Sequence, residues 1–233
     1  MGRADRQRLR ARHGLAGDPA HDLEAEAFTL LGQKVTWAEL IGNACALATV
    51  WLAIRRTIWT WPVQLTGNVL LFAVLVNAHL GGNAARQVMF AVLSGYGWWR
   101  WSRGMRGGDD LPVRHASAKE RLALAGLLVG GTAAMAAVLH HFDASWSPVP
   151  DAYIFVGSAV ATLAQGWALI EFWWIWVAVD AVGVPLAARS GLWVTAGVYG
   201  VFFVLCLIGY RDWRARSAVR AGMRLEETEA AAA

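Results

Sequence analysis

The chain has few charged residues, few cysteines and almost no lysine. Charged side chains make up 16% of its 233 residues and hydrophobic ones 57%, whereas soluble domains have about 25% charged residues. The two cysteines, Cys45 and Cys206, have no metal-ligand spacing, and we interpret them as small packing residues. The lysines are Lys34 and Lys119, both outside the apolar runs. A retinal protein is therefore excluded, because its Schiff base needs a lysine within the membrane.

The sequence also lacks the motifs of a nucleotide-binding or hydrolytic enzyme. It has no P-loop, no dinucleotide fingerprint and no nucleophile with a matching base. His140 and His141 have no cysteine or third histidine beside them, which argues against a metal site. We therefore expect a protein that is not an enzyme, with no catalytic residue, metal or cofactor. A membrane-embedded enzyme or a non-transporting scaffold is the alternative from another class.

What the chain has instead is seven long apolar runs. They are Ala38–Ile54, Ile58–Ala78, Ala85–Trp101, Leu122–Leu139, Ala152–Ile170, Trp173–Ala188 and Leu192–Tyr210. A helix that crosses a bilayer needs about 20 such residues, and it satisfies its own backbone hydrogen bonds there. Many of the 14 tryptophans lie near run ends, where indole rings favour the membrane interface. We predict an all-α integral membrane protein that spans a lipid bilayer.

The arginines indicate how these runs are oriented. They gather between the third and fourth runs and after the seventh, whereas the segment His140–Asp151 has neither Lys nor Arg. Cytoplasmic loops are rich in both residues, so we expect the Arg55–Arg56 turn and the C-terminus in the cytoplasm. The protein then lies in the inner or plasma membrane, with its N-terminus outside. Five arginines among the first twelve residues conflict with this orientation and stay unassigned. The net charge of +4 is thus a topology signal, and we expect no nucleic-acid partner.

The most informative pattern is a repeat with a constant spacing of 112 residues. Without any gap, this spacing relates Glu39 to Asp151, Trp61 to Trp173, Asn68 to Asp180, Phe90 to Phe202, Gly97 to Gly209 and Trp101 to Trp213. Each repeat holds three runs, and the unpaired fourth run adds one crossing, so both repeats face the same way. We predict seven transmembrane helices in a 3+1+3 bundle of parallel repeats, as in SWEET transporters. Such duplication is typical of carriers that hold a small solute between their halves.

The repeat also divides the chain into segments. We predict an N-terminal extension (1–36), a first three-helix repeat (37–101), a linker that contains the fourth helix (102–150), a second repeat (151–213) and a cytoplasmic tail (214–233). The fourth run is rich in Gly and Ala, which would let it pack closely against neighbouring helices.

The second helix of each repeat carries aromatic and polar residues at spacings of three and four, which place them on one face. They are Trp61, Gln64 and Asn68 in the first repeat and Trp173, Trp176 and Asp180 in the second. Polar groups in membrane helices usually face the bundle interior, so we predict a site for a planar solute with a hydroxylated tail. Gln87 and its repeat partner Tyr199 are further binding candidates, and Gln165 could also face the cavity. In the alternative, Asn68 and Asp180 only bridge helices.

The central parts of the repeated spans contain no Arg or Lys. A phosphorylated, anionic substrate would therefore lack a neutralising partner, so we expect a non-phosphorylated one.

Several segments resemble the PnuC family of bacterial vitamin transporters, across nearly all of residues 28–214. They are Trp37–Asn43, RRTIWTWPVQLTGN (Arg55–Asn68), ARQVMFAVLSGYGWWRW (Ala85–Trp101), DAYIFVGS (Asp151–Ser158) and EFWWIWVAVDAVGVPL (Glu171–Leu186). Within the family, IWTWP, DAYIFVG and EFWxxWxxVDxVGVPL resemble the actinobacterial riboflavin-uptake branch (RibM/PnuX) more than the nicotinamide riboside branch.

The resemblance implies a 3+1+3 homotrimer that moves a non-phosphorylated B vitamin by facilitated diffusion, with intracellular phosphorylation as the trap. Riboflavin is the expected substrate, and nicotinamide riboside or thiamine is the alternative. The family's motifs assign binding roles to Trp61, Asn68, Trp173, Trp176 and Asp180. The nicotinamide riboside branch usually has Asn where this chain has Asp180. This difference fits another substrate, although an acid could equally attract a cationic nicotinamide; proton coupling through Asp180 is left open.

Overall fold

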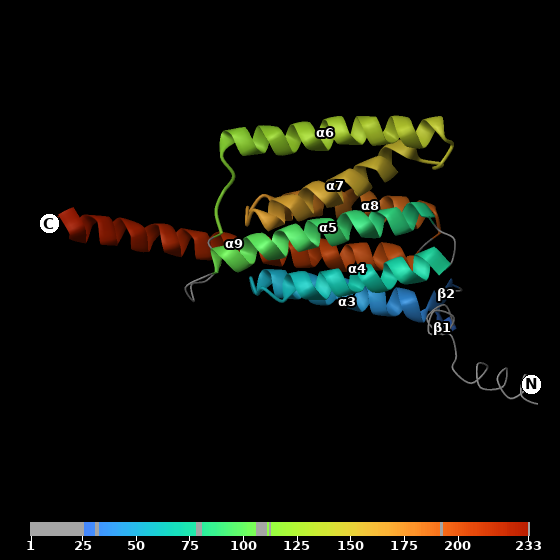
Figure 1. Ribbon diagram of the computed structural model, residues 1–233, viewed down its shortest axis with the longest axis horizontal. Coiled ribbons are helices and arrows are strands. Elements are labelled where there is room, and N and C mark those ends of the chain that lie inside the picture. Colours follow the sequence, from blue (N-terminus) through green and yellow to red (C-terminus); the bar gives the residue numbers. More distant parts are fainter. Residues whose placement is uncertain are drawn as a thin grey trace, which may run out of the picture.

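The structure, a computed structural model, describes residues 26–30, 33–77, 81–105, 111, 113–191 and 193–232 (Figure 1). The N-terminal arginine cluster lies outside these residues. The elements are β1 (Glu26–Leu30), β2 (Gln33–Thr36), α3 (Trp37–Ile54), α4 (Thr60–Asn77), α5 (Gly81–Gly104), α6 (Ala118–His141), α7 (Pro148–Gly166), α8 (Phe172–Arg189) and α9 (Trp193–Ala232). The two strands pair antiparallel within the predicted N-terminal extension, where we expected no sheet. Each of the seven predicted runs corresponds to one helix.

Two helices end elsewhere than their apolar runs. α7 stops at Gly166, four residues before Ile170, because the chain turns there and Ala168 has a φ of 54°. α9 continues far beyond Tyr210 to Ala232, since no proline follows to interrupt the helix. The predicted cytoplasmic tail is therefore mostly the end of a long helix, which extends out of the bundle in Figure 1.

Three described helices are long and apolar enough by themselves to cross a membrane. They are Ala118–His141, Phe172–Arg189 and the part of α9 from Trp193 to Val219. α4, α5 and α7 contain polar residues such as Gln64, Gln87 and Gln165, which lower their hydropathy. Polar residues of this kind are tolerated in membrane helices that face a bundle interior. The apolar helices support a multi-pass membrane protein.

Six of the described helices close into a ring, and α6 lies outside it. Around the ring, each helix packs against the next in the order α3, α4, α5, α7, α8 and α9, and α9 returns to α3. α6 packs against α7 at the edge of the bundle, and most of its side chains are exposed (Figure 1). The ring therefore encloses the interior without any contribution from α6.

Four tryptophans form the core of the ring. Trp61, Trp101, Trp173 and Trp213 are each at most 1% exposed. The rings of Trp61 and Trp101 meet edge to face at 5.2 Å, and those of Trp173 and Trp213 meet edge to face at 5.8 Å. These four tryptophans pack against one another inside the protein. Trp59, by contrast, is 64% exposed.

Two matched hydrogen bonds connect helices that are far apart in the sequence. Trp101 Nε1 donates to the Gln165 carbonyl at 3.0 Å, and Trp213 Nε1 donates to the Ala53 carbonyl at 3.1 Å. The two indoles are 112 residues apart, and so are the two carbonyls. α5 is thereby bonded to α7 in the same way as α9 is bonded to α3.

The same two carbonyls also shape the turns that follow them. Ala53 O accepts from Arg56 N, and Gln165 O accepts from Ala168 N, both at 2.9 Å. Arg56 and Ala168 have φ values of 56° and 54°, in the left-handed region that residues other than glycine rarely adopt. Each turn therefore needs an acceptor at a fixed place, and that acceptor is shared with an indole.

The tryptophan core depends on two glycines at matched positions. A Cβ atom added at Gly97 would overlap the ring of Trp61, and one added at Gly209 would overlap the ring of Trp173. Gly95, two residues away on the same helix, has open space around it.

We predict that Gly97→Ala lowers the free energy of unfolding by about 1–3 kcal/mol, because overpacking of a core costs that much. Gly95→Ala serves as the matched control and should leave stability unchanged or slightly raised, since alanine has the higher helix propensity. The measurement is thermal unfolding of both variants in detergent. Equal melting temperatures for the two would contradict the packing model.

Glu171 ties the turn between α7 and α8 to the start of α6. Its carboxylate accepts from Ala116 N at 2.9 Å and from Arg121 Nη2 at 2.8 Å, and His115 Nδ1 lies 3.4 Å away. Burial by itself raises the pKa of Glu171, but hydrogen bonds from Ala116, from its own backbone and from Arg121 outweigh burial and hold the pKa below the ordinary value of 4.5. The ionised carboxylate thus stabilises this corner of the fold.

Glu171→Gln should therefore lower the melting temperature at neutral pH. A lowered folded-state pKa gives stability that is fully present above about pH 4.5 and is lost as the pH falls through the lowered value. Unfolding of both proteins, measured across that range, should show the difference shrinking in acid. Arg121→Gln added to Glu171→Gln should cost little more than either change alone; additive losses would show that the two side chains act separately.

Candidate binding site

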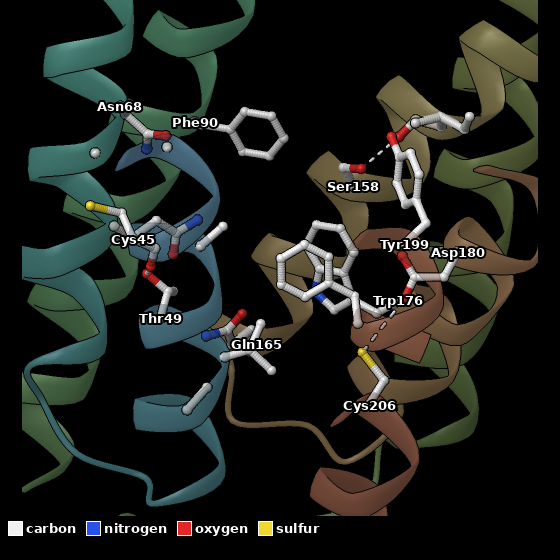
Figure 2. Close-up of a pocket in the computed structure, with 18 of the residues that line it drawn as sticks. Cys45, Thr49, Asn68, Phe90, Ser158, Gln165, Trp176, Asp180, Tyr199 and Cys206 are labelled. Carbon is white, nitrogen blue, oxygen red and sulfur yellow. Dashed lines mark hydrogen bonds between the residues drawn. The ribbon is translucent and has the colours of Figure 1, made fainter. Parts of the chain in front are cut away.

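A cavity of about 260 Å³ lies within the ring of helices. All six ring helices contribute lining residues, and none of the described lining residues comes from α6. Figure 2 shows Cys45, Thr49 and Asn68 on one side, facing Trp176 and Asp180 across the space. The ring thus provides one interior chamber with walls from both halves of the chain.

The structure brings most of the predicted site residues to this chamber. Seven of them line it: Gln64, Asn68, Gln87, Trp173, Trp176, Asp180 and Tyr199. Trp61 is not among the described lining residues, because it is buried beneath Gly97 in the tryptophan core. Its repeat partner Trp173 both packs in that core and lines the cavity. What these residues bind stays a prediction.

Asn68 and Asp180 have matched neighbours as well as matched positions. Asn68 Nδ2 donates to Ser94 Oγ at 3.4 Å, and Cys206 Sγ donates to Asp180 Oδ2 at 3.8 Å. Ser94 and Cys206 are themselves 112 residues apart. Each polar residue therefore links the second and third helices of its own repeat, and each also lines the cavity. Bridging and cavity lining are combined in the same side chains.

Several lining residues carry a buried polar atom that has no hydrogen-bond partner within the described part of the chain. These atoms are Gln64 Oε1, Arg86 Nε, Gln165 Nε2 and Trp173 Nε1. Buried polar atoms nearly always have a partner, and each exception calls for an explanation. Donors and acceptors that converge on one cavity are suited to a ligand with both kinds of group.

The two sides of the cavity differ in chemistry. α7 and α8 supply four aromatic rings, from Phe155, Phe172, Trp173 and Trp176, together with the polar side chains of Ser158, Gln165 and Asp180. α3 and α4 supply hydroxyl and amide groups from Thr49, Gln64 and Asn68. An aromatic wall offers flat surfaces for stacking, and the polar wall offers hydrogen bonds. The cavity therefore suits a solute with a flat ring and a polar tail.

Sequence reasoning missed some lining residues. Arg86 lines the cavity, so the expectation that an anionic solute would find no cation there is wrong. This arginine sits at the start of its run, and its adjacency to Gln87 was the available signal. Cys45 and Cys206 were interpreted only as packing residues but also line the cavity, whereas Gln165 lines it as the sequence allowed. Among the described residues, no group of His, Cys, Asp or Glu could hold a metal ion.

Comparison with known proteins identifies relatives over most of the chain. The family model described as nicotinamide mononucleotide transporter matches residues 36–215. The riboflavin/roseoflavin transporter RibM of Streptomyces davaonensis is 41% identical over 198 residues, which are 84% of this chain and 92% of RibM. The nicotinamide riboside transporter PnuC of Escherichia coli K12 is 25% identical over 208 residues, covering 78% of this chain and 87% of that protein.

A solved structure has a similar fold. The crystal structure of the vitamin B3 transporter PnuC superimposes with a TM-score of 0.63 at 19% sequence identity, over 78% of this chain and 82% of the other. These relatives are all named as transporters and none as an enzyme. The resemblance drawn from the sequence is confirmed, and the chain belongs to the PnuC family of membrane transporters.

Proposed function

We propose that the protein carries riboflavin across the bacterial cell membrane. The observation that carries this proposal is the interior cavity, in which an aromatic wall faces hydroxyl and amide groups. Riboflavin has the matching parts, a flat isoalloxazine ring and a ribityl chain of hydroxyls. The similarity to RibM, whose name states riboflavin and roseoflavin as its substrates, supports the same choice.

In this proposal, the isoalloxazine ring stacks on Trp173 and Trp176. The ribityl hydroxyls bind Gln64, Asn68 and Asp180, while Gln87 and Tyr199 contact the ligand from α5 and α9. Trp61 does not contact the ligand in this proposal. Its buried ring packs in the tryptophan core to which Trp173 belongs, and so helps to position Trp173. Stacking on an aromatic side chain is worth roughly 1–3 kcal/mol for nucleobases, and a flavin ring offers a larger surface.

The helices form two parallel three-helix repeats with α6 as the linker. The matched indole hydrogen bonds and the matched Asn68 and Asp180 contacts support this 3+1+3 arrangement. Transport then consists of movement of one repeat against the other around the fixed cavity. The arginine distribution favours a cytoplasmic C-terminus in the inner or plasma membrane, and the family resemblance favours a homotrimer.

Nicotinamide riboside is the second candidate substrate. Its cationic ring could pair with Asp180, which lines the cavity and is only 2% exposed. The similarity to the nicotinamide riboside transporter of E. coli is consistent with this choice. A binding competition between the two vitamins separates the candidates.

Trp176→Ala should weaken riboflavin uptake roughly five- to hundredfold if the lost stacking is worth 1–3 kcal/mol. Trp174→Ala is the matched control. Trp174 is also a tryptophan of α8, but it is 50% exposed and is not one of the described residues that line the cavity. The measurement uses proteoliposomes preloaded with unlabelled riboflavin and follows the uptake of labelled riboflavin from outside. Equal uptake by the two variants would rule out the aromatic wall as the binding surface.

Facilitated diffusion predicts that uptake into empty proteoliposomes stops when the inner concentration equals the outer one. A protonophore should leave both the rate and the final level unchanged. Enclosing riboflavin kinase and ATP should then drive accumulation, because the phosphorylated product no longer leaves. Accumulation above the outer concentration without the kinase, or loss of uptake with the protonophore, would show coupling to an ion gradient.

A further inference from the structure

The cavity contains one side chain of each charge among its described lining residues. They are Arg86 on α5 and Asp180 on α8. Arg86 Nε is buried without a hydrogen-bond partner in the described residues. Asp180 is 2% exposed, and it accepts a hydrogen bond from the weakly polar thiol of Cys206 at 3.8 Å. No ion pair joins the two within the described part of the chain, so each charge is presented to the chamber separately.

Neither charge is found at the matched position of the other repeat. The position that matches Arg86 in the second repeat is Val198, and the position that matches Asp180 in the first is Asn68. An uncharged residue therefore fills each equivalent place, on an equivalent helix. Two charges that the framework does not need, in an interior where charge is expensive, indicate a role in the cavity itself.

Among the described lining residues, the formal charges of these two side chains sum to zero. Tyr199 on α9 lines the same chamber. A solute of zero charge enters such a cavity without an unbalanced Coulomb energy. A cation is repelled by Arg86 and attracted by Asp180, and the reverse holds for an anion, so neither ion gains a net attraction that offsets the loss of its hydration.

We propose that Arg86 is a specificity-determining residue, which balances Asp180 so that the cavity accepts an uncharged vitamin and rejects cationic and anionic relatives. The inference rests on the proposed function, since it concerns the choice of substrate at the same site. Rejection by a like charge is a common way to exclude a wrong ligand. Arg86 in this role offsets the attraction that Asp180 alone would exert on a cationic pyridinium ring.

Binding of three probes to the purified full-length protein tests this inference. The probes are uncharged riboflavin, cationic nicotinamide riboside and flavin mononucleotide, which is riboflavin with an anionic phosphate. Quenching of tryptophan fluorescence gives the dissociation constant of each probe, and ratios of these constants are compared within each variant. A ratio cancels any general loss of affinity caused by a substitution.

Arg86→Gln should shift the ratio toward nicotinamide riboside by about tenfold or more, the scale expected for one unbalanced charge in a cavity of this kind. Asp180→Asn should shift the ratio toward flavin mononucleotide instead. Arg86→Lys keeps the charge and should keep the wild-type ratios. Arg103→Gln is the matched control on the same helix, because Arg103 is exposed and stacks on Trp99 outside the cavity; it should change no ratio.

The possible failures are distinguishable. If the wild-type protein binds no riboflavin, the proposed function is wrong. If it binds riboflavin but Arg86→Gln leaves the ratio to nicotinamide riboside unchanged, the charge balance is wrong while the function stands. If Arg86→Gln does not fold, Asp180→Asn alone tests the inference. An unchanged ratio of the dissociation constants for riboflavin and flavin mononucleotide in that variant would overturn it.

Discussion

The fold depends on how two backbone carbonyls at helix ends are satisfied. Ala53 O and Gln165 O lie at turns where the chain reverses through a left-handed residue. Both residues are buried, and buried backbone groups nearly always have hydrogen-bond partners. The indoles of Trp213 and Trp101 fill this need from the opposite halves of the chain. A local requirement of each turn thereby holds the two repeats together.

Residues that are identical between the repeats mostly pack the core, whereas residues that differ between the repeats mostly line the cavity. Trp101 and Trp213 pack and bond in the same way, and the glycines that admit Trp61 and Trp173 are identical too. Pairs in which both members line the cavity are mostly dissimilar. They are Gly42 with Ile154, Ala46 with Ser158, Ala53 with Gln165, Gln64 with Trp176, Asn68 with Asp180 and Gln87 with Tyr199, whereas Phe90 and Phe202 are identical. Core packing thus requires the same residues in both repeats, whereas most positions of the cavity wall can hold different residues.

This division explains which features could be predicted from the sequence. Apolar runs and a constant spacing are properties of the linear chain, so seven helices and the pairing of Asn68 with Asp180 follow from inspection. The spacing of three and four residues also selects the helix face that meets the cavity. It does not say how deep a side chain lies, and for this reason Trp61 and Trp173 looked equivalent although only Trp173 is among the described lining residues. Arg86 was overlooked because its place near a helix start gave no sign of which way the side chain points.

The proposed substrate, with a flat ring at one end and a polyol at the other, has no two-fold symmetry, whereas two identical repeats would form a symmetric cavity. Such a cavity would hold the ligand equally well in two opposite orientations, and neither would satisfy every polar group. Replacing an aromatic by an amide at one position of a pair, as between Trp176 and Gln64, gives the ring a single preferred wall. The matched packing of the four tryptophans persists beside this asymmetry, because the dissimilar pairs lie outside the tryptophan core. Packing and cavity lining are thus carried largely by different residues on the same helices, and Trp173, Asn68 and Asp180 contribute to both.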